Sequence, residues 1–160
     1  MAIHQASQPA ELDVCADIWL ESSLAAHDFI PAEFWLNNKE RMIQEYLPAA
    51  VVFLATSGGI PAGFAALGDS RLEALFVRPS FQGSGIGRAL LEHIFSLGGE
   101  PLTLSVYRKN TRAVRFYQYF GFEPLSVGRC PQTGEVELTM SQKKPSPEKV
   151  RAENGRDDWI

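Results

Sequence analysis

Apolar residues recur along this chain with two periods, one helical and one extended. Leu12, Cys15, Ile18 and Trp19 share one face at helical spacing, in a helix that opens near Pro9. The same criterion predicts helices at about 7–23, 32–47, 88–96 and 111–120. Short runs bounded by turn residues predict strands at 2–5, 51–56, 60–67, 71–77, 102–106, 125–129 and 135–141.

The order of these elements predicts one domain over residues 1–142. Short Ser-Gly-Gly and Gly-Asp-Ser turns join the second, third and fourth strands, which are therefore expected to be antiparallel. The fourth strand, the helix that follows it and the fifth strand are expected to form a parallel βαβ unit. Residues 143–160 are half charged and contain two prolines, so they are predicted to be a flexible tail or an interaction arm.

Composition narrows the functional class. The chain has 160 residues and a net charge of −4, and it lacks a basic stripe interleaved with aromatic residues, so nucleic acid is a poor candidate partner. No apolar run approaches the ~18 residues of a membrane helix, and the start does not resemble a signal peptide. Two cysteines and no cluster with metal-ligand spacing favour a reduced, cytoplasmic protein without a metal. The sequence does not distinguish a monomer from a homodimer.

A glycine-rich segment, Gln82–Arg88, follows the fourth predicted strand and opens a helix. This layout is typical of phosphate binding, because the N–H groups at a helix start lack intrahelical partners and carry partial positive charge. The segment is not a dinucleotide fingerprint, since Arg88 replaces the third glycine and Ser105 stands where an acidic residue belongs. It is not a Walker A loop either, because no Gly-Lys-Ser/Thr follows.

A second motif lies about 25 residues further along. Residues 110–122 contain Asn-x-x-Ala-x-x-Phe-Tyr-x-x-x-Gly-Phe. Each piece also has a purely structural interpretation, with Asn110 as a helix cap and Ala113 and Phe116 as core residues. Tyr117 by itself is equally consistent with a core tyrosine whose hydroxyl is hydrogen-bonded.

Taken together, the two motifs resemble those of the GCN5-related N-acetyltransferases, the GNAT family. The loop matches the pattern Gln/Arg-x-x-Gly-x-Gly/Ala, and the second motif follows in the right order, so the resemblance spans roughly residues 2–141. It implies an α+β fold with a mixed, mostly antiparallel twisted sheet, parallel splayed fourth and fifth strands, and helices on both faces. It also implies transfer of the acetyl group of acetyl-CoA to a primary amine, either a protein lysine or a small molecule.

The resemblance assigns coenzyme-binding roles on both sides of a cleft. The strand residues and the loop would hold the pantetheine arm and the diphosphate, and the second motif would face them. The implied set is Leu75, Phe76, Val77, Gln82, Gly83, Ser84, Gly85, Ile86, Gly87, Arg88, Asn110, Ala113 and Phe116. Tyr117 would protonate the leaving thiolate, a role that a neutral hydroxyl can fill.

The acceptor side is less defined by the sequence. Glu73 shares a strand face with Leu75 by alternation and is one candidate for the general base, acting through a water. His27 is the rival, since it lies in the loop where the family shapes its acceptor site and its intrinsic pKa suits a base. The segment around His27, with Phe29 and Trp35, resembles a bacterial subgroup related to YiaC and YjaB, whose members are described as lysine or small-amine acetyltransferases. Phe29 and Trp35 would then line the acceptor pocket, although aromatic residues at this spacing are more often core residues.

Two other functions stay open at this stage. A domain that keeps the coenzyme site but only senses acyl-CoA is one, although such a sensor has no need of a thiolate acid such as Tyr117. A toxin that acetylates aminoacyl-tRNA is the other, and it would want a basic groove that the sequence does not contain.

Overall fold

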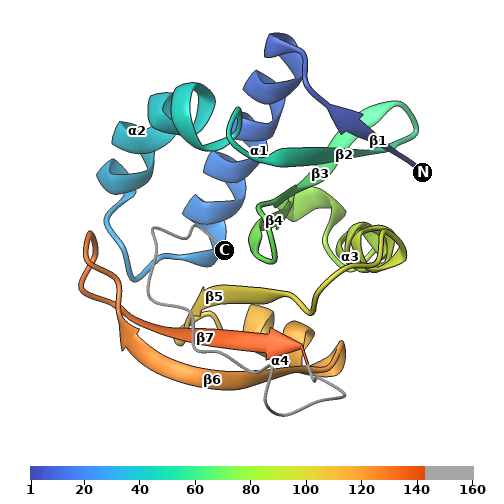
Figure 1. The fold of residues 1–160 in the computed structure, drawn as a ribbon. Coiled ribbons are helices and arrows are strands. Elements are labelled where there is room, and N and C mark those ends of the chain that lie inside the picture. Colours follow the sequence, from blue (N-terminus) through green and yellow to red (C-terminus); the bar gives the residue numbers. More distant parts are fainter. Residues whose placement is uncertain (143–160) are drawn as a thin grey trace.

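The computed structural model describes residues 1–142, so the predicted tail lies outside the described residues. The elements follow one another in the predicted order, and Figure 1 shows their arrangement. They are β1 (Ala2–Ala6), α1 (Pro9–Ala26), α2 (Ala32–Arg41), a π-helical turn (Met42–Tyr46), β2 (Val51–Ser57), β3 (Ile60–Leu67), β4 (Leu72–Val77), a 3₁₀ turn (Pro79–Phe81), α3 (Ile86–Ser96), β5 (Thr103–Tyr107), α4 (Thr111–Tyr119), β6 (Phe122–Arg129) and β7 (Val136–Gln142). None of the helices in this described part is long and apolar enough to cross a membrane.

The prediction of the second helix is wrong in its last turn. The sequence predicts one α-helix to residue 47, but α2 ends at Arg41 and the next residues widen into a π-helical turn. The N–H of Leu47 donates to the carbonyl of Met42, five residues back, at 2.9 Å. This wider turn allows Met42 and Leu47 both to be buried, each 1% exposed, before Pro48 ends the helical hydrogen bonding.

The strands form two antiparallel sheets, where the sequence predicts one mixed sheet. Their orders are β1-β2-β3-β4 and β5-β7-β6. Within the described residues, β4 and β5 pair only at an isolated parallel bridge between Arg71 and Thr103. The N–H of Thr103 also donates to the carbonyl of Ser70 at 3.0 Å. The two sheets are therefore hydrogen-bonded to each other at the start of β4 and β5, and not along their length.

Side chains of β4 alternate between two helical layers. Ala74 and Phe76 are buried in the core under α1, whereas Leu75 and Val77 pack against the core under α3 and stay half-buried. Figure 1 shows α1 and α3 on opposite sides of β3 and β4.

The alternation does not extend back to Glu73. The pairing register between β3 and β4 shifts opposite this residue, between Ala66 and Leu67 of β3. Glu73 lines a hollow with Ala74 and Met42, so the expectation that it shares the face of Leu75 is wrong.

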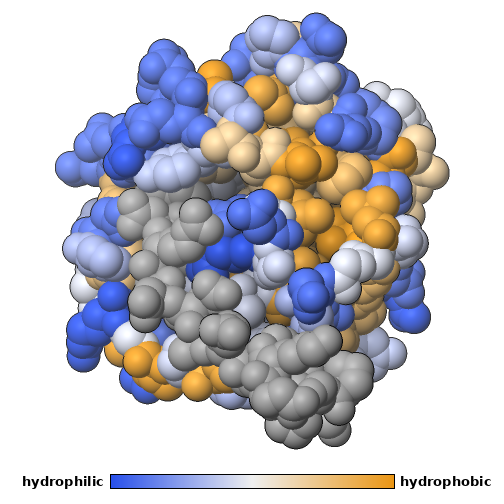
Figure 2. Space-filling view, viewed as in Figure 1, coloured by the Kyte–Doolittle hydropathy of each residue, from blue (hydrophilic) through white to orange (hydrophobic). Residues whose placement is uncertain are grey.

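The buried apolar stripe of α3 ends at Ile94. Ile86, Leu90 and Ile94 are buried, but Leu97 is 54% exposed because α3 ends at Ser96 and the chain turns away. In Figure 2, apolar side chains gather over the region of β2, β3 and α3, whereas hydrophilic ones cover α2.

A stability prediction follows from the close approach of β3 to β4 and α3. A Cβ atom at Gly63 would lie 2.8 Å from the carbonyl oxygen of Phe76 and 3.0 Å from Cγ2 of Ile86. Gly63→Ala should therefore lower the free energy of unfolding by about 1–3 kcal/mol, measured by urea denaturation. Gly128→Ala is the matched control, since a Cβ there meets nothing within 4 Å. Equal stability of the two variants would contradict the close packing.

Candidate functional site

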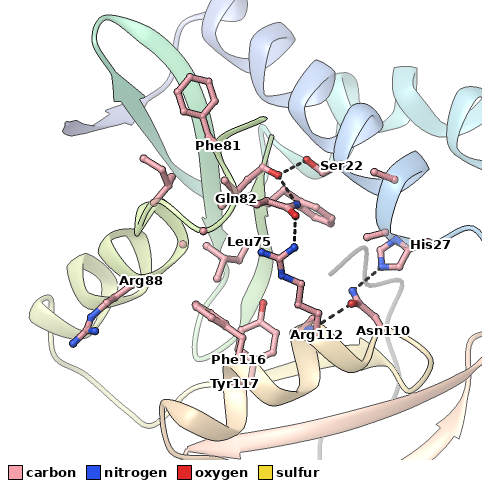
Figure 3. Close-up of a pocket in the computed structure, with 18 of the residues that line it drawn as sticks. Ser22, His27, Leu75, Phe81, Gln82, Arg88, Asn110, Arg112, Phe116 and Tyr117 are labelled. Carbon is pink, nitrogen blue, oxygen red and sulfur yellow. Dashed lines mark hydrogen bonds between the residues drawn. The ribbon is translucent and has the colours of Figure 1, made fainter. Parts of the chain in front are cut away.

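A cleft of about 600 Å³ opens at the end of β4 (Figure 3). Its walls come from the last turn of α1, the end of β4, the loop that enters α3, and the first turns of α4. Every residue that the sequence assigns to the coenzyme lines this cleft, except Ser84. Tyr117 and His27 line it too. The structure therefore brings together two motifs that are separated by about 25 residues in the sequence.

The loop from Gln82 to Arg88 has a backbone that glycine makes possible. Gly83 and Gly85 have φ angles of 81° and 89°, in the left-handed region that other residues rarely adopt. Gly85 is the N-cap of α3, and intrahelical bonding begins with the N–H of Ala89 donating to its carbonyl. The preceding N–H groups of α3 therefore have no intrahelical acceptors and border the cleft, which makes this wall suitable for an anion.

The end of β4 presents backbone groups toward the cleft. The N–H of Arg78 donates to Ala62 of β3 at 2.8 Å, so by alternation the N–H and carbonyl of Val77 point away from β3. The Val77 carbonyl instead accepts hydrogen bonds from Oγ of Ser22 at 2.9 Å and from Nε2 of Gln82 at 3.2 Å. Leu75, two residues earlier, faces the same side.

Gln82 also connects the two walls of the cleft. Its Oε1 accepts a hydrogen bond from Nη1 of Arg112 on α4 at 2.7 Å, as Figure 3 shows. The Arg88 side chain, in contrast, points away from the cleft and its Nε donates to Glu92 at 3.3 Å. Arg112 is therefore a cation that borders the loop, and the contribution of Arg88 to the cleft is mainly its backbone.

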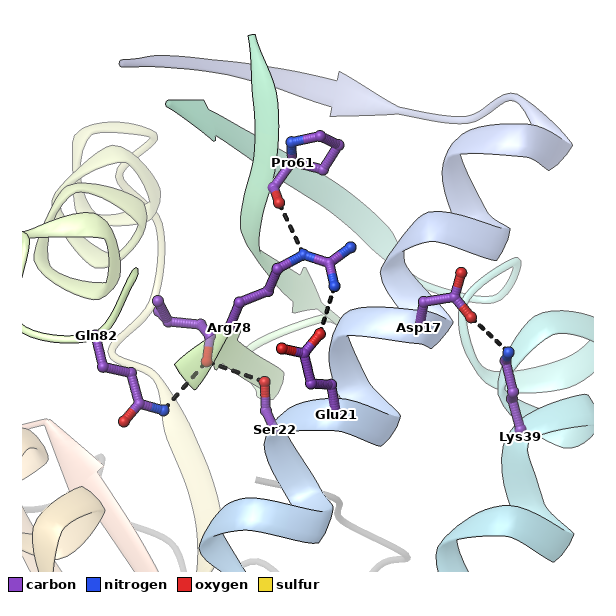
Figure 4. A network of polar contacts seen from close by, with 8 residues as sticks. Asp17, Glu21, Ser22, Lys39, Pro61, Arg78 and Gln82 are labelled. Carbon is purple, nitrogen blue, oxygen red and sulfur yellow. Dashed lines mark hydrogen bonds and ion pairs between the residues drawn. The ribbon is translucent and has the colours of Figure 1, made fainter. Parts of the chain in front are cut away.

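Polar contacts fix α1 to the end of β4 (Figure 4). Arg78 donates from Nε to the carbonyl of Pro61 at 2.9 Å and from Nη1 to Glu21 at 2.5 Å. Such a partly exposed ion pair contributes little stability, typically about 0–1 kcal/mol. Its geometric effect is to hold the Ser22 hydroxyl against Val77.

Helix α4 places a tyrosine hydroxyl in the cleft. Asn110 caps the helix, with Oδ1 accepting from the N–H of Ala113 at 3.3 Å. Two turns on, Tyr117 is 2% exposed, and Figure 3 shows its hydroxyl pointing into the cleft toward Leu75. Burial raises the pKa of Tyr117, so the side chain carries its proton throughout the neutral range.

His27 lies where the acceptor loop meets the cleft. It is 1% exposed, and its ring stacks on Trp35 with centroids 5.1 Å apart. Phe29 and Tyr107 meet the same ring edge-on, at 5.7 and 5.2 Å. Its Nε2 is 3.1 Å from Nδ2 of Asn110. Burial lowers the pKa of His27 to about 4, so the imidazole is neutral at pH 7.

The remaining predicted acceptor residues do not line this cleft. Phe29 and Trp35 surround His27 instead, with Trp35 completely buried. Glu73 lines a second hollow of about 330 Å³ with Asp69 and Tyr46. Its Oε1 lies 3.5 Å from Nε of Arg71. Among the described residues, no group of three or more His, Cys, Asp or Glu side chains could hold a metal ion.

Sequence reasoning missed several residues of the cleft wall. Arg112 lies inside the second motif, so the sequence places it near the cleft. Its contact with Gln82, 30 residues earlier, cannot be predicted from the motif. Ser22 gave no signal, because the hydroxyl of a helical serine indicates nothing until its acceptor is known. The other residues missed are Ala25, Ala26, Phe81, Lys109 and Thr111.

Comparisons with known proteins agree with this geometry. A family model described as an acetyltransferase (GNAT) domain matches residues 48–124. Peptidyl-lysine N-acetyltransferase YjaB of Escherichia coli strain K12 is 38% identical over 107 residues, which cover 66% of this chain and 71% of YjaB. Peptidyl-lysine N-acetyltransferase YiaC of the same strain is 35% identical over 133 residues, which cover 82% of this chain and 88% of YiaC.

Solved structures show the same fold. The solution structure of apo-form YjaB aligns with a TM-score of 0.75 and 31% identity, covering 88% of this chain and 97% of YjaB. PaiA N-acetyltransferase of Thermoplasma acidophilum, solved in complex with coenzyme A, aligns with a TM-score of 0.71 and 18% identity over 90% of this chain and 100% of PaiA. The chain belongs to the GNAT family and is an acetyl-CoA-dependent N-acetyltransferase.

The burial of His27 predicts a pH dependence of stability. The unfolded chain binds a proton on this ring near pH 6.5, and the folded chain binds it only near pH 4. Stability from this residue is therefore complete above about pH 6.5 and is lost as the pH falls toward 4, by about 3 kcal/mol. His27→Gln, which cannot titrate, should lack this part of the decline in urea denaturation between these pH values. Parallel curves for the two proteins would show that His27 titrates normally.

Proposed function

We propose that this enzyme transfers the acetyl group of acetyl-CoA to the side-chain amine of lysine in a protein substrate. The observation that carries the proposal is the buried hydroxyl of Tyr117, which faces the end of β4 in the same cleft as the glycine loop. The choice of lysine is supported by YjaB and YiaC, which are peptidyl-lysine N-acetyltransferases.

The coenzyme would enter between the diverging β4 and β5. Beyond the bridge at Arg71 and Thr103, the two strands have no further pairing, so the edge of β4 at Leu75 and Val77 would face the amides of the pantetheine arm. Parallel strands that splay from this bridge would give the arm the place of an extra strand. The helix start at 85–88 would hold the diphosphate, because its N–H groups lack intrahelical acceptors.

Tyr117 would act as the general acid. As the amine attacks, the thioester carbonyl gains negative charge, and a backbone N–H of β4 is suited to stabilise it. The carbon–sulfur bond then breaks, and the tyrosine proton passes to the leaving thiolate. The raised pKa of Tyr117 supports this role, since the group must arrive protonated.

The amine must lose its proton before it attacks, because a lysine side chain has a pKa near 10.4. Glu73 is our candidate for the base, acting through water. It lies two residues before Leu75, about 7 Å earlier along β4. Its carboxylate in the second hollow would also attract a cationic lysine. His27, the other candidate, is closer to the cleft but strongly disfavours a proton.

Replacing the acid should separate catalysis from coenzyme binding. Tyr117→Phe should reduce kcat at least about 100-fold, because general acid catalysis typically contributes 10²–10⁴-fold, while the Kd for acetyl-CoA changes little. The assay is thiol release from acetyl-CoA with lysine-containing peptides, compared with a panel of small amines. Tyr119→Phe is the matched control, since Tyr119 lies on the same helix and is 74% exposed.

Two outcomes would overturn this proposal in different ways. A Tyr117→Phe enzyme with the full rate would remove the acid assignment. A wild-type protein that prefers small amines to every lysine peptide would remove the protein substrate and leave the chemistry intact.

The base assignment predicts a change in pH dependence. Glu73→Gln should abolish the acidic limb of the kcat/KM profile and lower the rate, because no carboxylate remains to accept the proton. Glu92→Gln, an exposed carboxylate on α3, serves as the control. An unchanged acidic limb in Glu73→Gln would show that another group, or water alone, removes the proton.

A further inference from the structure

The contact between His27 and Asn110 joins the acceptor loop to the coenzyme wall. His27 follows the last residue of α1, and Asn110 is the residue before α4. Their side-chain nitrogens Nε2 and Nδ2 are 3.1 Å apart, although 83 residues separate them in the sequence. Figure 3 shows the two side chains facing each other at one edge of the cleft.

The direction of this hydrogen bond follows from the helix cap. Oδ1 of Asn110 accepts the N–H of Ala113 at 3.3 Å, and this fixes which end of the amide is the oxygen. The NH₂ end therefore faces His27, and an amide nitrogen can only donate. Nε2 of His27 must then be the acceptor, so the neutral ring carries its proton on Nδ1.

The surroundings of His27 keep the ring in this neutral form. Trp35 of α2, Phe29 of the loop and Tyr107 of β5 contact its ring. The cation of Lys109 is separated from it, with Nζ lying 5.6 Å above the ring of Phe29. Within residues 1–142, no carboxylate contributes to the lowered pKa of His27, and burial is its cause. A group whose lone pair is already used and whose charged form is disfavoured is poorly suited to accept a proton from an amine.

We propose that His27 is a positioning residue that holds the Asn110 amide in the orientation required at the coenzyme wall, and that it does not remove the proton from the acceptor amine. Because Nε2 of His27 accepts a hydrogen bond from the Asn110 amide nitrogen, Oδ1 of Asn110 stays in position to cap α4. Helix α4 in turn carries Tyr117. Loss of the His27 acceptor frees the amide to rotate, which weakens the cap and the wall together.

The test uses two substitutions of similar size that cannot titrate. His27→Gln keeps an acceptor oxygen near the position of Nε2, whereas His27→Leu keeps the bulk and loses the acceptor. His27→Leu should raise the KM for acetyl-CoA and lower kcat/KM about tenfold, and His27→Gln should stay within about threefold of wild type. The acidic limb of the pH–rate profile should persist in His27→Gln. His4→Gln, at an exposed histidine bonded to Glu11, is the control.

Nitrogen-15 NMR of the free wild-type protein tests the tautomer independently of activity. At pH 7, the chemical shift of Nδ1 of His27 should be that of a protonated ring nitrogen, and the shift of Nε2 that of an unprotonated one. The opposite tautomer, or a charged ring, overturns the inference even if both variants fold poorly.

The kinetic test rests on the proposed acetyl transfer. Its outcomes distinguish a wrong function from a wrong role of His27. A wild-type enzyme that acetylates no amine contradicts the proposed function, not the role of His27. An active wild type with His27→Gln as impaired as His27→Leu, or with the acidic limb lost, shows that the imidazole itself is required and overturns the inference.

Discussion

The parallel bridge between Arg71 and Thr103 is the constraint around which the two sheets are arranged. Backbone groups inside a protein must find hydrogen-bond partners, and a strand end that leaves its neighbour exposes groups that need them. At the end of β4, Ser22 from α1 and Gln82 from the loop fulfil this need for Val77. The separation of the two sheets thus determines where α1, the glycine loop and α4 must converge.

Features that depend on local chemistry were predictable from the sequence. The left-handed φ angles at Gly83 and Gly85 and the capping by Asn110 require particular residue types within a few positions, so the sequence indicates them directly. The π-helical turn was not predictable, because it arises where Met42 and Leu47 are buried together. The contacts of Ser22 and Arg112 were not predictable either, since their acceptors lie 55 and 30 residues away.

The residues on the acceptor side were also only partly predictable from the sequence. His27 was a reasonable candidate base by residue type and loop position, but the type alone does not specify which ring nitrogen is engaged. That property comes from a chain of contacts through Asn110 to Ala113. Alternation along β4 predicted Glu73 on the face of Leu75, but a register shift at this residue, which no periodicity indicates, leaves its carboxylate in a separate hollow beside Arg71.

The double hydrogen bond at the Val77 carbonyl has a thermodynamic consequence for any ligand arm that runs beside β4. A carbonyl oxygen has two lone pairs, and Ser22 and Gln82 already use both. An incoming amide that donates to this oxygen exchanges one hydrogen bond for another, and such exchanges change the free energy little. The arm of the ligand would therefore determine how far the reacting group extends into the cleft. Most of the binding free energy would come from the charged end, which the loop holds.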